Sequence, residues 1–218
     1  MADVIELVIF DCDGTLIDSE TLGIEVDRVA MAAFGLPMSE REIIDRFVGL
    51  DAAAKTAALS ELLGRPLPAD WWEEYRPLHN RLVEEKLAPM PGVPEALAAI
   101  DLPTCVASNS SHSWLRRGLE LTGLYERFAG RIFSGAEDVP RGKPAPDLFL
   151  HAARTLGADP AACVVVEDSA HGVAAARAAG MPVLAYTAGV TPPERLAGPG
   201  TVLFDDMREL PRLLAAGP

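Results

Sequence analysis

Residues 8–18, VIFDCDGTLID, decide the fold of this chain. The apolar run from Val4 to Phe10 is rich in β-branched and aliphatic residues, which predicts a buried strand. It ends in two carboxylates, Asp11 and Asp13, which start on the same side of an extended segment. Such a pair is costly unless a cation binds there or the two acids differ in protonation for acid–base work. A solvated acidic turn is the plainer alternative.

A second strand of this kind comes late in the chain. Residues 162–166, ACVVV, are followed directly by Glu167 and Asp168. In doubly wound α/β sheets, ligands bind at the carboxyl edge of the strands. Four acids that converge on such an edge call for a cation, and hard oxygen ligands suit Mg²⁺. The sequence therefore predicts a magnesium site that includes Asp11 and Asp13 as well as the two later acids.

Two loops between these strands carry residues suited to binding a phosphate. Residues 108–111, SNSS, follow a predicted strand and precede a helix, so hydroxyl and backbone N–H groups can surround an anion. An ordinary serine-rich helix cap is the alternative. Lys143 lies in RGKPAPD at 141–147, where two prolines stiffen the loop. A loop lysine is usually solvated, but this one stands on a rigid backbone suited to aiming a cation into a site.

The segment between the first and second strands contains only helical patterns. Apolar residues recur at helical spacing from Leu22 to Phe34, Ser39 and Glu42 form a capping box, and a fourth helix is expected to begin near Ala69. After residue 91, strands and helices alternate. The chain therefore predicts an α/β protein with a Rossmann-like parallel sheet of about six strands and an inserted helical module.

Composition limits the classes of function. The chain has 218 residues, 49% of them hydrophobic, enough for one core and one smaller module. A formal net charge of −13 disfavours nucleic-acid binding. No apolar run reaches membrane-spanning length and no signal peptide is recognisable, so we expect a cytoplasmic protein. Three scattered cysteines predict buried thiols, without a disulfide or a zinc site. We expect a monomer, with a dimer as the alternative.

The string FDCDGTLIDS at 10–19 resembles the signature of the haloacid dehalogenase-like (HAD) phosphohydrolase superfamily. Ser108, Lys143 in KPAPD, and Glu167 with Asp168 match the later motifs in family order. The resemblance covers essentially the full chain and is strongest to the helical-cap group, which includes sugar phosphatases and β-phosphoglucomutases. It implies an α/β core at 1–15 and 89–218 and a cap at 16–88.

The resemblance also implies roles for individual residues. Asp11 is expected to attack phosphorus and form an aspartyl-phosphate, and Asp13 to act as general acid and then as general base. Mg²⁺ is expected on Asp11, the Asp13 carbonyl and Asp168, with Glu167 bound directly or through water.

For the phosphate, the expected ligands are Ser108, the backbone of Asn109, and Lys143. Cap residues near 47–50, among them Gly49, and also Lys55 and Arg81 are candidates for substrate contacts. Together these assignments predict a Mg²⁺-dependent phosphomonoester hydrolase acting on small metabolites such as sugar phosphates.

Three alternatives differ from this prediction in specific residues. A dehalogenase would lack the second aspartate, so Asp13 argues against that branch. A sugar-phosphate mutase of the β-phosphoglucomutase type would need a histidine where this chain has Gly23, and basic residues where it has 48–52. Arg76 or Arg81 could restore a basic contact, so the mutase stays open. A binding module without catalysis would have lost a motif residue, and none is lost.

Overall fold

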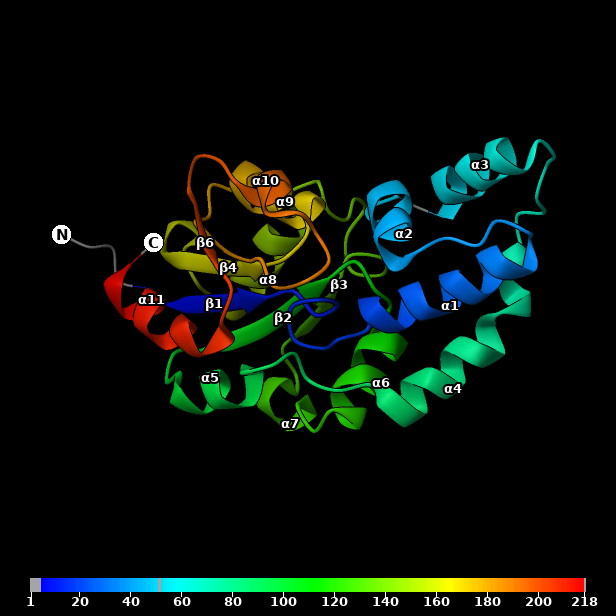
Figure 1. The fold of residues 1–218 in the computed structure, drawn as a ribbon. Coiled ribbons are helices and arrows are strands. Elements are labelled where there is room, and N and C mark those ends of the chain that lie inside the picture. Colours follow the sequence, from blue (N-terminus) through cyan, green and yellow to red (C-terminus); the bar gives the residue numbers. More distant parts are fainter. Residues whose placement is uncertain (1–4, 51, 218) are drawn as a thin grey trace. The chain divides into compact units, whose positions relative to one another are not determined.

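A computed structural model of the chain describes residues 5–50 and 52–217. Its chain forms two compact units, drawn in Figure 1. The core unit comprises the chain up to Asp18 and from Ala88 onward, and the cap unit is Ser19–Leu87. The sequence predicts these limits at residues 16 and 88. Residues 16–18 stay in the core unit because Ile17 accepts a hydrogen bond from the Gly14 N–H (2.9 Å) and bridges to Pro89.

The core unit is organised by a parallel sheet. Within the described residues its strand order is β3-β2-β1-β4-β5-β6, and each neighbouring pair is parallel. The strands are β1 Leu7–Phe10, β2 Thr104–Ser108, β3 Ile132–Ser134, β4 Cys163–Glu167, β5 Val183–Tyr186 and β6 Thr201–Phe204. This confirms the predicted six-stranded α/β architecture. The first strand is shorter than predicted from the sequence, and Val4 lies outside the described residues.

Helices cover both faces of this sheet, as Figure 1 shows. One face carries α8 Asp147–Leu156, α9 Ala170–Ala178 and α10 Pro193–Leu196. The other carries α5 Val93–Ala99, α6 His112–Leu121, α7 Tyr125–Phe128 and α11 Leu210–Ala216. Every residue of β1 and β4 is buried, which explains why both read as continuous apolar runs rather than as alternating patterns.

The strand order places the site. From β1 the chain moves outward through β2 and β3, and then returns to form β4 on the opposite side of β1. Phe10 pairs with Val166, so β1 and β4 end side by side. In sheets of this kind the crevice lies at the carboxyl ends of the strands where the order reverses. Asp11 and Asp168 follow those two ends directly.

In its described residues the cap unit contains helices and connecting turns but no strand. It contains α1 Glu20–Ala33, α2 Glu40–Phe47, α3 Ala52–Leu63 and α4 Arg76–Lys86. The predicted capping box of Ser39 and Glu42 is present at the start of α2. The expected fourth helix is instead a 3₁₀ turn, Trp71–Glu74, followed by α4, because Pro77 is favoured in the first turn of a new helix. Residue 51 lies outside the described residues.

A largely buried ion pair joins two cap helices. The Lys55 ammonium on α3 contacts both oxygens of Asp27 on α1, at 2.6 and 2.5 Å. It also lies over the Trp71 ring, 5.9 Å from the centroid. Burial raises the pKa of Asp27, and Lys55 acts against that rise. Lys55 thus neutralises a carboxylate inside the cap unit, which makes it a poorer candidate for holding a substrate anion.

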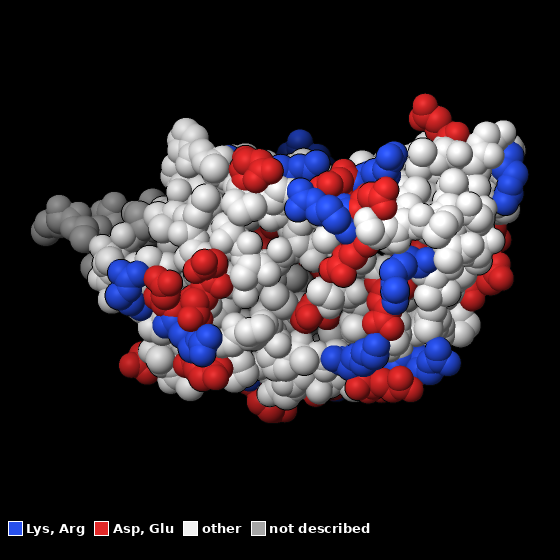
Figure 2. All heavy atoms as spheres, in the orientation of Figure 1, with Lys and Arg blue, Asp and Glu red and all other residues white. Residues whose placement is uncertain are grey.

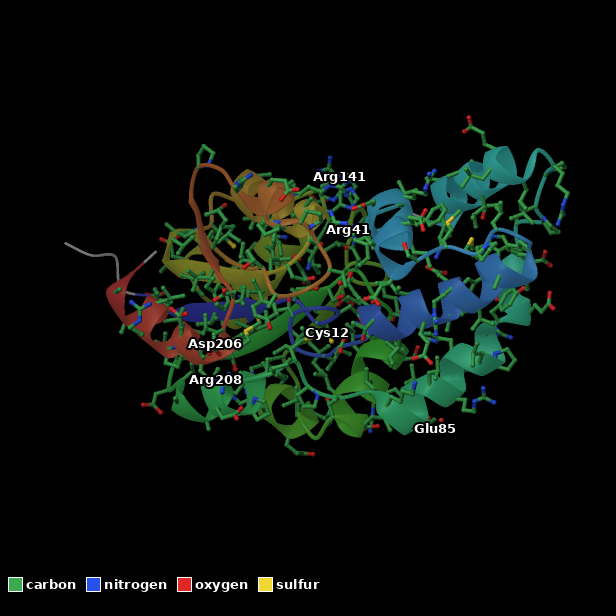
Figure 3. All side chains as sticks on the ribbon, viewed as in Figure 1. Cys12, Arg41, Glu85, Arg141, Asp206 and Arg208 are labelled. Atoms are coloured by element: carbon green, nitrogen blue, oxygen red, sulfur yellow. The ribbon has the colours of Figure 1, made fainter. Side chains whose placement is uncertain are left out.

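Other general expectations can be compared with the structure. Cys12, Cys105 and Cys163 are all buried free thiols, as predicted. None of the helices in the described part of the chain has both the length and the apolar character that a membrane span needs. On the face shown in Figure 2, basic and acidic side chains are interspersed. Several form surface pairs such as Arg208 with Asp206 (2.9 Å), both labelled in Figure 3.

Candidate active site

Three buried carboxylates meet at the carboxyl edge of β1 and β4. Asp11, Glu167 and Asp168 each offer an oxygen, and these oxygens lie within 4.8 Å of one another. Cys12, labelled in Figure 3, marks the loop that leaves β1 here. Because β1 and β4 are neighbours in the sheet, acids more than 150 positions apart in sequence meet here. The Asp11 N–H donates a hydrogen bond to the Val166 carbonyl and so joins the two strand ends.

Lys143 is the cation at the centre of this cluster. Its Nζ lies 2.6 Å from Asp11 Oδ1 and 2.6 Å from Glu167 Oε1, and all three side chains are buried. Burial acts to lower the pKa of Lys143, but the two carboxylates outweigh it and hold that pKa above its usual value. Burial, together with Glu167 and Asp13, raises the pKa of Asp11 although Lys143 opposes the rise. The positive charge of Lys143 therefore does not fully offset the burial and mutual repulsion of the neighbouring carboxylates.

The side chain of Asn109 fixes the backbone that carries Lys143. Its Oδ1 accepts a hydrogen bond from the Lys143 N–H (2.8 Å), and its Nδ2 donates to the Lys143 carbonyl (3.0 Å). Gly135 and Gly142 pack against this amide so closely that a Cβ on either would overlap Asn109 Oδ1. The Asn109 side chain therefore joins the loop after β2 to the loop before α8, which leaves its backbone as the group predicted for phosphate.

The two carboxylate oxygens of Glu167 have different partners. While Oε1 contacts Lys143, Oε2 accepts hydrogen bonds from the Asp168 N–H (2.9 Å), the Ser169 N–H (2.8 Å) and the Ser169 hydroxyl (2.9 Å). Ser169 in turn caps α9 by accepting from the Gly172 N–H (3.0 Å). Glu167 is thus held at the start of α9 and holds Lys143 in place.

Gly172→Ala should displace Glu167, because a Cβ at this position overlaps the Glu167 carboxylate. We expect the free energy of unfolding to fall by about 1–3 kcal/mol, together with a clear loss of catalytic activity. Urea denaturation would measure the first effect. Gly23→Ala is the matched control: Gly23 is also helical, has no atom within 4 Å of its added Cβ, and should keep or raise stability. Equal stability of Gly172→Ala and the unmodified chain would contradict this packing.

Asp13 is held apart from the three clustered acids. Its Oδ1 accepts from the Trp114 indole N–H (2.8 Å), and its Oδ2 accepts from the Ser110 hydroxyl (2.7 Å). Asp168 Oδ1 likewise accepts from the Thr15 hydroxyl (2.6 Å). No local pattern selects Trp114 or Thr15, because the carboxylate that each of them bonds lies about a hundred or more positions away in the chain.

Ser108 ends β2 beside this cluster and is buried. Its hydroxyl accepts from the Ser110 N–H (3.3 Å), and its carbonyl accepts from the Gly135 N–H (2.7 Å). Ser111 caps α6 by accepting from the Trp114 N–H (3.3 Å). Hydrogen bonds at both ends, at Ser108 and at Ser111, therefore fix the loop that is predicted to surround a phosphate.

The structure brings the predicted core residues to one edge of the sheet. These are Asp11, Asp13, Ser108, Asn109, Lys143, Glu167 and Asp168. Gly49 and Arg81 belong to the cap unit: Gly49 follows α2 with a φ of +85°, and Arg81 is exposed on α4. Their contribution to substrate binding stays a prediction.

Residues 5–180 match the sequence model of the haloacid dehalogenase-like hydrolases. The chain belongs to this family. As the sequence predicted, it is a HAD-like hydrolase whose relatives include proteins named as sugar phosphatases and as β-phosphoglucomutases.

Individual relatives resemble this HAD chain along nearly their whole length. A protein named 6-phosphogluconate phosphatase from Escherichia coli (strain K12) is 31% identical over 214 residues, covering 97% of this chain and 96% of its own. A haloacid dehalogenase-like protein from Agrobacterium tumefaciens is 37% identical with a TM-score of 0.89, covering 97% and 98%. A putative β-phosphoglucomutase from Thermotoga maritima is 27% identical with a TM-score of 0.79, covering 97% and 99%.

The donor set fits a divalent metal ion. Asp11, Glu167 and Asp168 supply only carboxylate oxygens, and their combined charge exceeds that of the one buried ammonium among them. Oxygen-rich, anionic sites favour Mg²⁺ over softer metals. The raised pKa of Asp11 shows the electrostatic cost that such a cation would relieve.

Proposed function

We propose that this HAD phosphatase is a Mg²⁺-dependent phosphomonoester hydrolase that acts on small phosphorylated sugars or polyols through an aspartyl-phosphate. The observation that carries the proposal is the position of Asp11 at the end of β1. There its carboxylate contacts Lys143 at 2.6 Å and lies within 4.8 Å of an oxygen on Glu167 and on Asp168. A buried, cation-flanked carboxylate at a strand end is suited to nucleophilic attack on phosphorus.

In the first step, an Asp11 oxygen forms a bond to phosphorus as the bond from phosphorus to the ester oxygen breaks. Asp13 gives its proton to that oxygen, so the alcohol leaves neutral. In the second step, water attacks phosphorus, Asp13 takes the proton of the water, and the bond between Asp11 and phosphorus breaks. The sum is hydrolysis of the ester to alcohol and phosphate, with both aspartates restored.

Positive charge and hydrogen-bond donors must hold the equatorial phosphoryl oxygens while this happens. We assign this role to Lys143, the Ser108 hydroxyl and the Asn109 backbone, and the hydrogen bonds that fix their loops support the assignment. Asp11, Asp168, Glu167 and the Asp13 carbonyl would hold Mg²⁺, which would reduce the repulsion between nucleophile and phosphate. The carboxylate of Asp13 is engaged by Ser110 and Trp114 instead.

The sequence of the cap unit and the names of the relatives support the proposed substrate class. The 48–52 segment carries no lysine or arginine, which favours a substrate without a second strong anion. A relative of similar length is named for 6-phosphogluconate, a phosphorylated sugar acid. We propose Gly49 and Arg81 as substrate-contacting cap residues, and we expect the enzyme to act as a cytoplasmic monomer.

A sugar-phosphate mutase is the second candidate, favoured by the 27% identity to a putative β-phosphoglucomutase. Two further observations weigh against it. The chain has Gly23 where that reaction would need a histidine, and Lys55 already neutralises Asp27 within the cap unit. Fewer cationic groups are then left to grip a second phosphate.

Phosphate release from a matched set of substrates tests the proposal. Glucitol 6-phosphate and 6-phosphogluconate differ chiefly in one carboxylate, so their ratio of kcat/KM isolates the effect of a second anion. We expect Mg²⁺-dependent turnover, with glucitol 6-phosphate, which lacks the carboxylate, at least as good a substrate. A strong preference for 6-phosphogluconate would change the substrate class. Isomerisation of glucose 1-phosphate in the presence of a bisphosphate, without phosphate release, would establish the mutase instead.

A further inference from the structure

The orientation of Asp13 is controlled from α6. Asp13 lies in a loop, not in a strand, and Gly14 turns the chain directly after it with a φ of +80°. In the structure one oxygen accepts from the Trp114 indole (2.8 Å) and the other from the Ser110 hydroxyl (2.7 Å). Both donors come from the segment that starts α6.

These two donors stand on a rigid platform. The Ser110 carbonyl accepts from the buried Ser134 hydroxyl at the end of β3 (2.7 Å). The Trp114 backbone is fixed in the first turn of α6 by the Ser111 cap. Leu115 and Leu119 anchor that helix in the core with no exposed surface. A carboxylate gripped at both oxygens by such groups has one defined orientation.

We propose that Trp114 is a positioning residue for Asp13: its indole N–H, together with the Ser110 hydroxyl, orients the carboxylate that serves the leaving-group oxygen. This inference rests on the proposed function, which assigns proton transfer to Asp13. Loss of the indole N–H frees the carboxylate to rotate and slows the step in which the ester oxygen must be protonated. Substrate binding, which depends on other residues, changes little.

A purely structural role for Trp114 predicts different behaviour. In that case the bond to Asp13 would serve only to satisfy the indole N–H, and its loss would not affect proton transfer. Trp114→Phe keeps an aromatic ring and removes the donor. With a purely structural role, Trp114→Phe would lower stability, and it would either reduce the rates on all substrates by the same factor or leave them all unchanged.

The first experiment observes the contact itself, without catalysis. The chain has three tryptophans, so a ¹H–¹⁵N spectrum contains three indole N–H signals, and Trp114→Phe identifies the one from Trp114. We expect Asp13→Ala to move that signal and to leave the signals of Trp71 and Trp72 in place. An unchanged Trp114 signal in Asp13→Ala would overturn the inference even if the enzyme is a phosphatase.

The second experiment uses the dependence of general-acid catalysis on the leaving group. An alkyl alcohol must be protonated as it leaves, whereas p-nitrophenolate leaves readily without a proton. We expect Trp114→Phe to lower kcat/KM for an alkyl phosphate about tenfold or more, and for p-nitrophenyl phosphate by much less. Ser110→Ala should give the same pattern and covers the case in which Trp114→Phe does not fold.

Trp72→Phe is the matched control, because Trp72 lies in the cap unit and packs edge-on against His79. It should leave the ratio between the two substrates unchanged. Equal losses on both phosphates in folded Trp114→Phe and Ser110→Ala would overturn the positioning role. An unmodified chain that hydrolyses neither phosphate would instead overturn the proposed function, and the indole spectrum would still decide whether Trp114 holds Asp13.

Discussion

Asp11→Asn should reduce phosphate release by about 10⁴-fold or more, to the background of the assay. The amide oxygen is a poor nucleophile and carries no negative charge, so the aspartyl-phosphate cannot form at a useful rate. The side chain keeps its shape at the end of β1, and for this reason we expect the fold to persist. Circular dichroism and phosphate release on the same preparation would measure both properties.

Asp206→Asn is the matched control for this substitution. Asp206 is a half-buried aspartate in the core unit that pairs with Arg208 at 2.9 Å, and asparagine caps a helical turn as well as aspartate does. The Asp206→Asn variant should release phosphate as fast as the unmodified chain does. Substantial activity in folded Asp11→Asn would show that another group attacks phosphorus.

Lys143→Met should lower activity by about 10²–10³-fold, because the phosphoryl oxygens lose a charged donor in a buried site. The same change leaves the Asp11 and Glu167 carboxylates without the ammonium that contacts both of them. Removal of one partner from a buried ion pair costs about 3–5 kcal/mol, so the free energy of unfolding should fall markedly in chelated protein. Urea denaturation and initial rates measure the two effects.

Lys86→Met serves as the control for Lys143→Met. The Lys86 ammonium pairs with Glu25 at 2.8 Å in the cap unit, where Lys86 is exposed and Glu25 is only half-buried. Surface pairs contribute only about 0–1 kcal/mol, so stability should hardly change. If Lys143→Met is as stable as Lys86→Met, the contacts of Lys143 with Asp11 and Glu167 do not stabilise the fold.

Much of this fold was predictable because its two central strands are recognisable in the sequence. β1 and β4 are buried on both faces, so their apolar runs stand out, and the acids that follow them mark the carboxyl edge. Parallel strands end together, which predicts that loops distant in sequence meet there. The fourth cap helix was less predictable, because its apolar spacing continues from Trp71 into α4 although Pro77 starts a new helix.

The hydrogen bonds inside the site could not be predicted in the same way. The bond from Trp114 to Asp13 depends on how α6 packs beside the sheet, and nothing near Trp114 in sequence signals it. The backbone of Asn109 is predicted to bind phosphate, but no local pattern predicted that its side chain would bond to the Lys143 backbone. Such contacts arise from tertiary packing between loops, on which local residue patterns carry no information.

The joint between the two units has an evolutionary consequence. The Asp18 N–H donates to the Ala88 carbonyl (3.0 Å), and the Met90 N–H donates to the Leu16 carbonyl (2.9 Å), so the chain leaves and re-enters the core unit at neighbouring points. A foreign helical module with closely spaced ends could be spliced in there without cutting a strand. Recombination at this joint would exchange the helical insert, while the acids and the lysine at the sheet edge are inherited unaltered.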